Sequence, residues 1–252
     1  MYIYCLGSRF NWLIFISVFL IVMVSCKPKP AADKIKGSSS DSIRILGTVA
    51  EEEPLQPEQL QPDPVPLSQL ADTTFIRLAD YDDSFVYDMR YATTNNFLKA
   101  QVYDCAECYT RVKTAKALIE ANAVFKKKGY RIKFFDCYRP NAVQYKMWEI
   151  MPNPQYVANP VKGSIHNKGG AVDITLVDEN GKELAMGTDF DFFGKAAHHD
   201  YLQHSDTILG NRKLLKAIME KHGFWSIRTE WWHYNLSAAS NDPVANFKWN
   251  CK

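Results

Sequence analysis

Apolar residues recur about every 3.6 positions in three segments of the chain, and this spacing predicts three helices. The helices are expected at 111–128, from Pro140 onward, and at 211–222. Gly129 and Gly223 directly follow the first and third segments, and glycine commonly ends a helix.

Runs of alternating or β-branched residues between these helices predict three strands. They are expected at 131–136 (RIKFFD), 171–177 (AVDITLV) and 230–236 (EWWHYNL). Asn180-Gly181 follows the second run, and this dipeptide is a strong signal for a tight hairpin. The elements mix without a regular strand–helix–strand repeat. The sequence therefore predicts the α+β class, with a central, largely antiparallel sheet flanked by helices.

The composition fits a packed globular domain. Of the 252 residues, 46% are hydrophobic and 23% are charged, and the formal net charge is +2, which lies within the range of ordinary domains. Because so balanced a charge provides no extended basic surface, we expect no nucleic-acid partner.

The first 25 residues are expected to be a signal peptide. An apolar run from Trp12 to Val24 follows Arg9, and it has the length of a signal-peptide core but is short for a spanning helix. The run ends just before Cys26, an arrangement that resembles the lipidation site of bacterial lipoproteins. The alternative is an uncleaved signal anchor with an incidental cysteine. Both interpretations export the protein and tether it to a membrane, and the first predicts a membrane-anchored lipoprotein facing the periplasm.

Residues 26–70 are expected to form a disordered tether behind the lipidated cysteine. Positions 51–66 contain five acidic residues, five prolines and no basic residue. Such a stretch buries too little apolar surface to offset its ordering entropy. The folded part is therefore expected to be a single domain, residues 71–252, of ordinary size.

The segment 164–173 (SIHNKGGAVD) contains the first candidate chemistry. His166 lies in a glycine-rich loop and Asp173 lies on the strand that follows it. Gly169 and Gly170 allow a tight turn, so both side chains can reach one point. An imidazole and a carboxylate are good zinc ligands, although a histidine and an aspartate in a loop are more often structural.

The segment 230–233 (EWWH) offers a third nitrogen ligand, His233, and a spare carboxylate, Glu230. Two histidines and one acidic ligand leave zinc an open position, as in catalytic sites, and Glu230 is then free to accept a proton. In a straight strand these two side chains point to opposite faces, so they share a site only through a bulge, a turn or an intervening water. The alternative is a buried aromatic strand with a surface glutamate.

Arg139 lies between a predicted strand and a predicted helix. Such an arginine can direct a permanent, forked charge into a cleft and stabilise the oxyanion that develops during amide hydrolysis. The alternative is a surface arginine at the start of a helix.

These motifs resemble a known family. The pattern S-x-H-x-x-G-x-A-x-D at 164–173, combined with E-x-W-H at 230–233, is similar to the zinc D,D-peptidases that share a fold with the hedgehog signalling domain. Four further segments resemble the D-alanyl-D-alanine dipeptidases known from vancomycin resistance: 88–97, 136–140, 186–192 and 231–234. The resemblance extends from about residue 88 to residue 235 and implies the hedgehog/D,D-peptidase fold.

The resemblance implies a role for each matching residue. One zinc ion per chain would be held by the three ligands His166, Asp173 and His233. Glu230 would act as general base and then as general acid, and Arg139 would polarise the substrate carbonyl and hold the tetrahedral intermediate.

The resemblance also implies a substrate site for a small dipeptide. Asp191 falls where the family binds the free ammonium group of the substrate, and Ser164 and Tyr91 fall where it surrounds the dipeptide. Two departures affect the pocket: Cys137 replaces a glycine that is typical of the family, and the stretch 140–164 is shorter than in the resistance enzymes. The size of the pocket and its strictness for free dipeptides are therefore open at this point.

Four cysteines lie in the predicted exported domain: Cys105, Cys108, Cys137 and Cys251. An even number in an oxidising compartment indicates disulfides, and four cysteines allow three pairings. The working hypothesis pairs Cys105 with Cys108 and Cys137 with Cys251. Cys105-x-x-Cys108 is also compatible with a structural zinc site or a redox pair, although no thioredoxin-like sequence surrounds it.

Three functions remain in competition. The first is zinc-dependent hydrolysis of the D-alanyl-D-alanine dipeptide in cell-wall peptide metabolism. The second is a zinc D,D- or L,D-carboxypeptidase acting on peptidoglycan stem peptides, and Asp191 distinguishes it from the first. The third is a non-catalytic, zinc-stabilised module that binds wall peptides. Glu230 and Arg139 argue against the third, because a binding module needs no base beside an open metal site.

Overall fold

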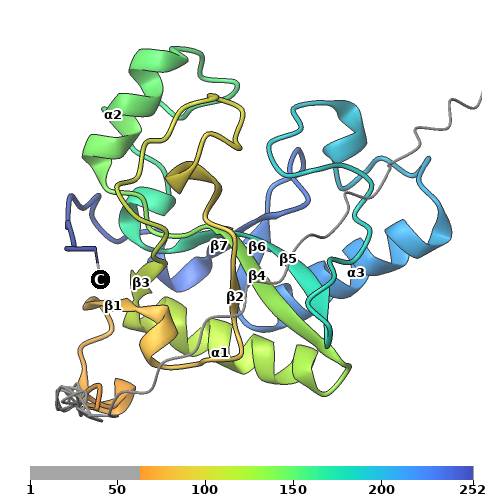
Figure 1. The fold of residues 1–252 in the computed structure, drawn as a ribbon, viewed down its shortest axis with the longest axis horizontal. Helices are drawn as coiled ribbons and strands as arrows, with labels where there is room; N and C mark the ends of the chain where they lie inside the picture. The colour runs from red at the N-terminus through yellow and green to blue at the C-terminus, as the bar shows by residue number, and fades with distance from the viewer. Residues whose placement is uncertain (1–62, 252) are drawn as a thin grey trace, which may run out of the picture. The chain divides into compact units, whose positions relative to one another are not determined.

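The computed structural model of the protein describes residues 63–251. Its centre is a five-stranded sheet (Figure 1) in which only the first neighbouring pair is parallel, and the prediction of an α+β fold with a largely antiparallel sheet is confirmed. In spatial order the strands are β2 (Val86–Tyr87), β4 (Tyr130–Asp136), β5 (Ala171–Asp178), β7 (His233–Leu236) and β6 (Phe224–Ser226). A separate antiparallel pair consists of β1 (Phe75–Arg77) and β3 (Tyr109–Arg111).

In the described part of the chain, three α-helices surround the sheet in the order predicted: α1 (Val112–Lys126), α2 (Asn141–Ile150) and α3 (Asp206–Lys221). In the view of Figure 1, α1 lies below the sheet and α2 lies above it, whereas α3 packs against β6. Helix α2 begins directly after Pro140, as expected. Helix α3 begins five residues before the predicted start, because Gly210 continues the helix where a glycine would more often interrupt one.

Among residues 63–251, six short 3-10 helices connect these elements: Leu67–Gln69, Leu78–Asp80, Arg90–Ala92, His166–Lys168, Lys195–Ala197 and Ser237–Ala239. Leu67 and Leu70, which lie in the predicted tether, pack against the core of the domain. The predicted signal peptide, the predicted lipidation of Cys26 and most of the predicted tether lie outside the described residues. Between residues 63 and 251, no helix combines the length and the apolar character needed to cross a membrane.

The core lies between α1 and the central strands. Strand β5 is buried along almost its whole length, and α1 contributes Val112, Ala115, Leu118 and Phe125, all fully buried. This burial explains the two sequence patterns. A strand covered on both faces forms a continuous apolar run, and a helix covered on one face shows the 3.6-residue period.

The pairing of three strands fixes the centre of the molecule. A register shift between Phe134 and Asp136 sets Asp136 opposite Asp173 on β5. On the other side of β5, Asp173 is opposite His233, the first residue of β7. Because directly opposed residues lie within a few ångströms of each other, the sheet itself brings these three side chains together.

The expected strand at 230–236 is too long. Glu230 to Trp232 form a turn before β7, in which the His233 amide donates to the Glu230 carbonyl at 3.4 Å. The sequence does not reveal this turn, because Trp231 and Trp232 are apolar and buried, and so they look like a continuation of the strand. The turn removes the difficulty that a straight strand would separate the side chains of Glu230 and His233.

The predicted turn at Asn180-Gly181 is present, but the hairpin is short. Gly181 has a φ of 80°, and the Asp178 amide donates to the Lys182 carbonyl at 2.9 Å. The returning chain forms only an isolated bridge, between Val177 and Glu183, within the described part of the chain.

The predicted disulfide pairing is wrong, although all four cysteines form disulfides. Cys105 is bonded to Cys251, and Cys108 is bonded to Cys137. Cys108 directly precedes β3, which lies beside the loop that follows β4 and carries Cys137. These tertiary contacts decide the pairing, and neither the metal site nor the redox pair considered for Cys105-x-x-Cys108 exists.

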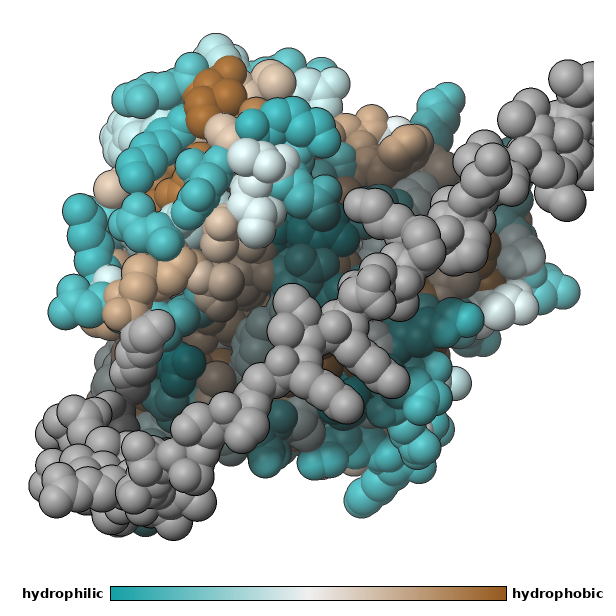
Figure 2. Space-filling model, in the orientation of Figure 1, coloured by the Kyte–Doolittle hydropathy of each residue, from teal (hydrophilic) through white to brown (hydrophobic). Residues whose placement is uncertain are grey.

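The surface on the side of α2 carries several exposed apolar side chains. On the face shown in Figure 2, hydrophilic residues predominate and hydrophobic residues gather mainly over this region. Tyr145 and Ile150 on α2, with Tyr156 and Val161 in the following loop, are each at least 40% exposed. Tyr156 also lines the cavity of the candidate site, so the apolar surface continues into that cavity.

Candidate active site

The three predicted metal ligands lie together at the end of the central strands. His166 Nε2 is 3.2 Å from His233 Nδ1 and 3.4 Å from Asp173 Oδ1, and His233 Nδ1 is 2.9 Å from the same Asp173 oxygen. Within residues 63–251, this trio is the group of three or more His, Cys, Asp or Glu side chains with the spacing needed to hold a metal ion. His166 and Asp173 are buried, and His233 is partly buried.

The glycines of the loop position His166. Gly169 follows the 3-10 helix His166–Lys168 with a φ of 73°, a conformation that favours glycine. A side chain on Gly170 would collide with Ala239. The loop therefore needs Gly169 for its backbone conformation, as the sequence pattern suggested, and Gly170 for close packing, which the sequence did not indicate.

Hydrogen bonds on the far side of each ring set the protonation of the two histidines. His166 Nδ1–H donates to the Cys137 carbonyl at 2.7 Å, and His233 Nε2–H donates to Asn235 Oδ1 at 2.9 Å. In the neutral rings the facing nitrogens, Nε2 of His166 and Nδ1 of His233, then carry lone pairs. Two lone pairs and a carboxylate oxygen thus converge with no hydrogen between them, an arrangement that a bound cation stabilises.

The electrostatics of the trio agree with this interpretation. Burial acts to raise the pKa of Asp173, but the neighbouring His166 and His233 outweigh it, and the pKa lies well below its ordinary value. Burial acts to lower the pKa of His233, but the Asp173 carboxylate, 2.9 Å from Nδ1, outweighs it and raises the pKa. The carboxylate is therefore kept charged, and the point between these groups attracts positive charge.

Glu230 lies beside the trio without belonging to it. Its carboxylate oxygen is 4.0 Å from His233 Nδ1, and the side chain is 24% exposed. Burial raises the pKa of Glu230 above its ordinary value, which brings a carboxylate closer to the range useful for proton transfer at neutral pH. The interpretation of Glu230 as a surface glutamate is therefore wrong, because the side chain lines the cavity of the trio.

Arg139 is buried and firmly held, so the interpretation as a surface arginine is also wrong. Its Nε and Nη2 donate to Asp136 Oδ2 at 3.2 and 2.6 Å, and its Nη1 donates to Gln144 Oε1 at 2.9 Å. The guanidinium also lies 5.3 Å from the centre of the Tyr91 ring. Arg139 lines the same cavity as the trio and Glu230, so a fixed positive charge faces that cavity.

Asp136 is a functional residue that the motif analysis left without a role. Besides Arg139, it accepts hydrogen bonds from the Tyr103 hydroxyl at 2.6 Å and from the Cys137 amide at 2.9 Å, and it is fully buried. Its position at the end of a predicted strand, three residues before Arg139, was the available signal. Asn235 was missed as well, because nothing in its local sequence links it to the ring of His233.

Asp191 and Tyr91 form a second polar cluster in the cavity. The Tyr91 hydroxyl contacts both carboxylate oxygens of Asp191 at 3.1 Å. Burial, followed by the charge of Asp173, raises the pKa of Asp191 well above its ordinary value. Asp191 has a φ of 60°, and such a conformation in a non-glycine residue is often associated with function. Tyr91 thus positions Asp191 in addition to lining the cavity.

The cavity is small and contains every residue predicted for the active site. Its volume is about 220 Å³, and its lining includes Ser164, the trio, Glu230, Arg139, Tyr91 and Asp191. The Ser164 hydroxyl is buried and has no hydrogen-bond partner among the described residues, so it is available to a ligand. The apolar part of the lining includes Tyr156 and Phe193, whose ring centres are 4.8 Å apart.

Comparison with known proteins agrees with this geometry. A family model described as D-ala-D-ala dipeptidase (Peptidase_M15) matches residues 72–250. The D-alanyl-D-alanine dipeptidase of Escherichia coli is 33% identical over 183 residues, which are 72% of this chain and 95% of that protein. The D-alanyl-D-alanine dipeptidase of Enterococcus faecalis is 30% identical over 171 residues, 60% of this chain and 85% of that protein.

Among solved structures, the chain is similar to the LD-carboxypeptidase LdcB, with a TM-score of 0.36 and 22% identity over 52% of this chain and 62% of that one. The family match covers almost all of the described residues and includes the trio, Glu230 and Arg139. The chain belongs to the D-Ala-D-Ala dipeptidase family of metallopeptidases.

Proposed function

We propose that the protein is a zinc-dependent dipeptidase that hydrolyses free D-alanyl-D-alanine. The observation that carries this proposal is the convergence of three lone-pair donors on one point, beside a carboxylate that is not among them. Family membership and relatives that are themselves D-alanyl-D-alanine dipeptidases support the same activity. A non-catalytic binding module would need neither Glu230 nor the buried Arg139.

The donor set fits zinc, one ion per chain. Two imidazole nitrogens and one carboxylate oxygen are the ligand types of catalytic zinc sites. In a tetrahedral site with such ligands, two ligand atoms lie about 3.3 Å apart. Two of the three separations in the trio, 3.2 and 3.4 Å, match this value, and the third, 2.9 Å, is somewhat shorter. His166, Asp173 and His233 would hold the ion.

Glu230 is the proton carrier of the proposed reaction. Zinc in this site supplies Lewis acidity toward a water molecule and the substrate carbonyl. Glu230 accepts the proton of the attacking water and returns it to the nitrogen of the leaving D-alanine. Its raised pKa makes the carboxylate a stronger base toward the water, while the carboxylic acid remains acidic enough to protonate an amine nitrogen.

Arg139 stabilises the negative charge that develops on the attacked carbonyl oxygen. Asp136 and Gln144 fix the guanidinium before the substrate arrives, so the charge needs little reorganisation during the reaction. Three of the five N–H groups of the guanidinium donate to these two residues, and the other two are free to face the cavity.

Asp191 supports a preference for a free dipeptide over a longer chain. The ammonium group of a dipeptide lies only a few bonds from the scissile carbonyl, and Asp191 lines the same cavity as the trio and Arg139. An ammonium next to Asp191 returns this carboxyl group to its charged form, against the burial that raises its pKa. An N-acylated substrate has a neutral amide there and loses this charge-assisted bond.

This proposal predicts the relative rates of two substrates. Wild-type protein should show a kcat/KM for D-Ala-D-Ala on the order of 10–100-fold above that for N-acetyl-D-Ala-D-Ala, because a hydrogen bond to a charged group contributes about 1.5–3 kcal/mol. Asp191→Asn should remove most of this preference. Tyr91→Phe is the matched control, since it removes the hydroxyl group that holds Asp191 but keeps the carboxylate, and it should narrow the preference less. Equal kcat/KM values for both substrates in the wild type would favour the carboxypeptidase.

We also propose that the mature protein is a lipoprotein anchored through Cys26 and exported to the periplasm. The proposal is supported by the apolar run that ends just before this cysteine and by the acidic, proline-rich stretch that follows. Cys26→Ser should abolish incorporation of labelled fatty acid and release the protein from the membrane fraction. Cys5→Ser, which changes a cysteine of the predicted signal peptide, should leave labelling unchanged. Labelling that persists in the Cys26→Ser protein would contradict the proposal.

A further inference from the structure

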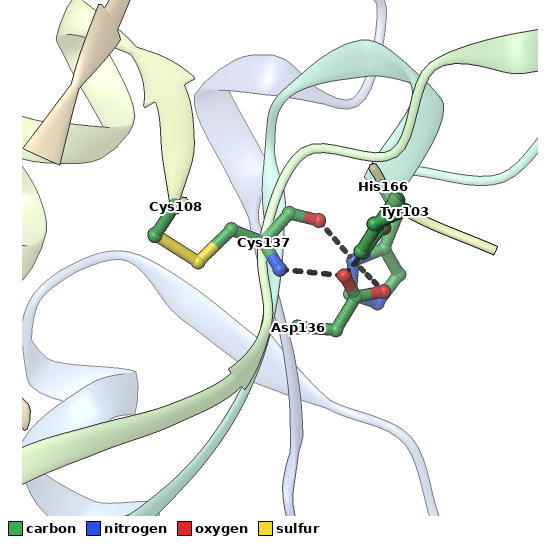
Figure 3. The surroundings of a disulfide bond; sticks show 5 residues. All are labelled: Tyr103, Cys108, Asp136, Cys137 and His166. Atoms are coloured by element: carbon green, nitrogen blue, oxygen red, sulfur yellow. Dashed lines mark hydrogen bonds and ion pairs between the residues drawn. A yellow bond between two sulfur atoms is a disulfide. The ribbon is translucent and has the colours of Figure 1, made fainter. Parts of the chain in front are cut away.

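Cys137 connects a disulfide directly to the candidate metal site (Figure 3). Its side chain is bonded to Cys108, its carbonyl oxygen accepts the hydrogen bond of His166 Nδ1–H at 2.7 Å, and its amide donates to Asp136 Oδ1 at 2.9 Å. Both cysteines are buried. Cys137 is thus part of a covalent cross-link and also contacts two residues of the site: His166, a proposed metal ligand, and Asp136, which holds Arg139.

The peptide groups of Cys137 are not held by the sheet. The ladder between β4 and β5 ends at the pair Asp136 and Asp173, just after a register shift. Beyond it, separate hydrogen bonds to other segments hold the chain: the Tyr138 amide donates to the Tyr109 carbonyl at 2.9 Å, the Arg139 amide donates to the His166 carbonyl at 3.1 Å, and the Asn167 side-chain amide donates to the Arg139 carbonyl at 2.8 Å. Isolated bonds restrain the direction of a carbonyl less than a continuous ladder does.

The other half of the disulfide is well anchored. Cys108 directly precedes β3, and its carbonyl accepts a hydrogen bond from the Leu78 amide at 2.9 Å. At the end of β3, the Arg111 amide donates to the Gly169 carbonyl at 3.2 Å, in the loop that carries His166. The disulfide therefore joins the loop after β4 to a strand that is already fixed to the same part of the site.

We propose that the Cys108–Cys137 disulfide is a positioning element of the metal site. It holds the Cys137 carbonyl so that His166 presents its Nε2 lone pair to the metal, and it holds the Cys137 amide so that Asp136 keeps Arg139 in place. This inference rests on the proposed zinc site. Groups that orient a ligating histidine typically contribute about 10–100-fold to metal affinity.

The second disulfide provides a matched control. Cys105–Cys251 has a sequence separation of 146, against 29 for Cys108–Cys137. In the chain-entropy model a cross-link that closes a longer loop contributes more to global stability. The hydrogen bonds recorded for His166 and Asp136 do not involve Cys105 or Cys251. If both disulfides are purely structural, loss of Cys105–Cys251 should accelerate zinc release more. If Cys108–Cys137 positions the site, its loss should accelerate zinc release more.

The test compares two double variants of the full chain: Cys108→Ala/Cys137→Ala and Cys105→Ala/Cys251→Ala. Replacing both cysteines of a pair leaves no new thiol to bind zinc. For each protein, the rate of zinc transfer to a chromogenic chelator is measured well below the unfolding temperature, together with that temperature and with kcat and KM for D-Ala-D-Ala. We expect Cys108→Ala/Cys137→Ala to lose zinc about 10–100-fold faster than wild type and to lose kcat more than KM. We expect Cys105→Ala/Cys251→Ala to release zinc at the wild-type rate, although its unfolding temperature falls at least as far.

Other rankings overturn the inference. If the rate of zinc release rises in proportion to the drop in unfolding temperature in both variants, the Cys108–Cys137 disulfide is structural only. If Cys108→Ala/Cys137→Ala releases zinc at the wild-type rate, the disulfide has no positioning role. Cys108→Ala/Cys137→Val, which refills the volume of the sulfur atoms, guards against a folding defect. If it restores slow zinc release, packing suffices and the cross-link is not the positioning element. A wild-type protein that binds no zinc would instead overturn the proposed function itself.

Discussion

Replacing His166 by alanine is expected to abolish both stoichiometric zinc binding and D-Ala-D-Ala hydrolysis. His166 Nε2 is one of three converging ligand atoms, and two remaining ligands cannot hold a catalytic ion well. Because metal-ion catalysis contributes several kcal/mol and each 1.4 kcal/mol is a tenfold change in rate, the loss of kcat/KM should be at least about 10³-fold. The same result is expected for Asp173→Ala and His233→Ala. Metal analysis of the purified proteins and steady-state kinetics measure the two effects.

Asn235→Ala is the control that separates a ligand from its support. It removes the acceptor that orients the ring of His233 but leaves all three ligands, so zinc affinity should fall by about 10–100-fold and excess zinc should restore activity. His166→Ala should not recover in excess zinc. A His166→Ala protein with one tightly bound zinc and normal turnover would show that the metal lies elsewhere.

Glu230→Gln is expected to keep its zinc and lose most of its activity. The side chain is not part of the ligand trio, and its carboxylate lies 4.0 Å from His233 Nδ1. Glutamine preserves the size of the side chain but cannot accept the proton of the attacking water. Loss of a general base typically costs about 10²–10⁴-fold in rate, and the loss should appear in kcat.

Zinc content distinguishes this outcome from structural damage. Glu230→Gln protein should bind one zinc per chain and unfold at close to the wild-type temperature. Loss of zinc in this variant would identify Glu230 as a fourth ligand. Full activity would assign the proton transfer to another group in the cavity.

The sequence was most informative where the chemistry is local. His166 and Asp173 are separated by a glycine-rich turn, and Gly169 has the positive φ that this spacing suggested. Strand β5 and helix α1 were predictable because burial on two faces or on one face leaves a regular apolar pattern. The hedgehog/D,D-peptidase resemblance rested on these same local motifs.

The parts that the sequence left open depend on tertiary contacts. The turn at 230–232 was hidden by Trp231 and Trp232, which are apolar and buried without belonging to a strand. The cysteine partners are far apart in sequence, so spacing alone could not select among three pairings. Asp136 and Asn235 support the site through bonds to atoms on other segments, and no local pattern reports such bonds.

The most direct test of the central claim is a zinc titration of metal-free protein with D-Ala-D-Ala as the substrate. We expect metal-free protein to be inactive, and hydrolysis to increase in proportion to added zinc until it reaches its maximum at one zinc per chain. The D-alanine released should equal twice the dipeptide consumed, since one peptide bond is cleaved. Full hydrolysis by metal-free protein, or one bound zinc per chain with no hydrolysis of D-Ala-D-Ala, would show that the protein is not a zinc-dependent D-Ala-D-Ala dipeptidase.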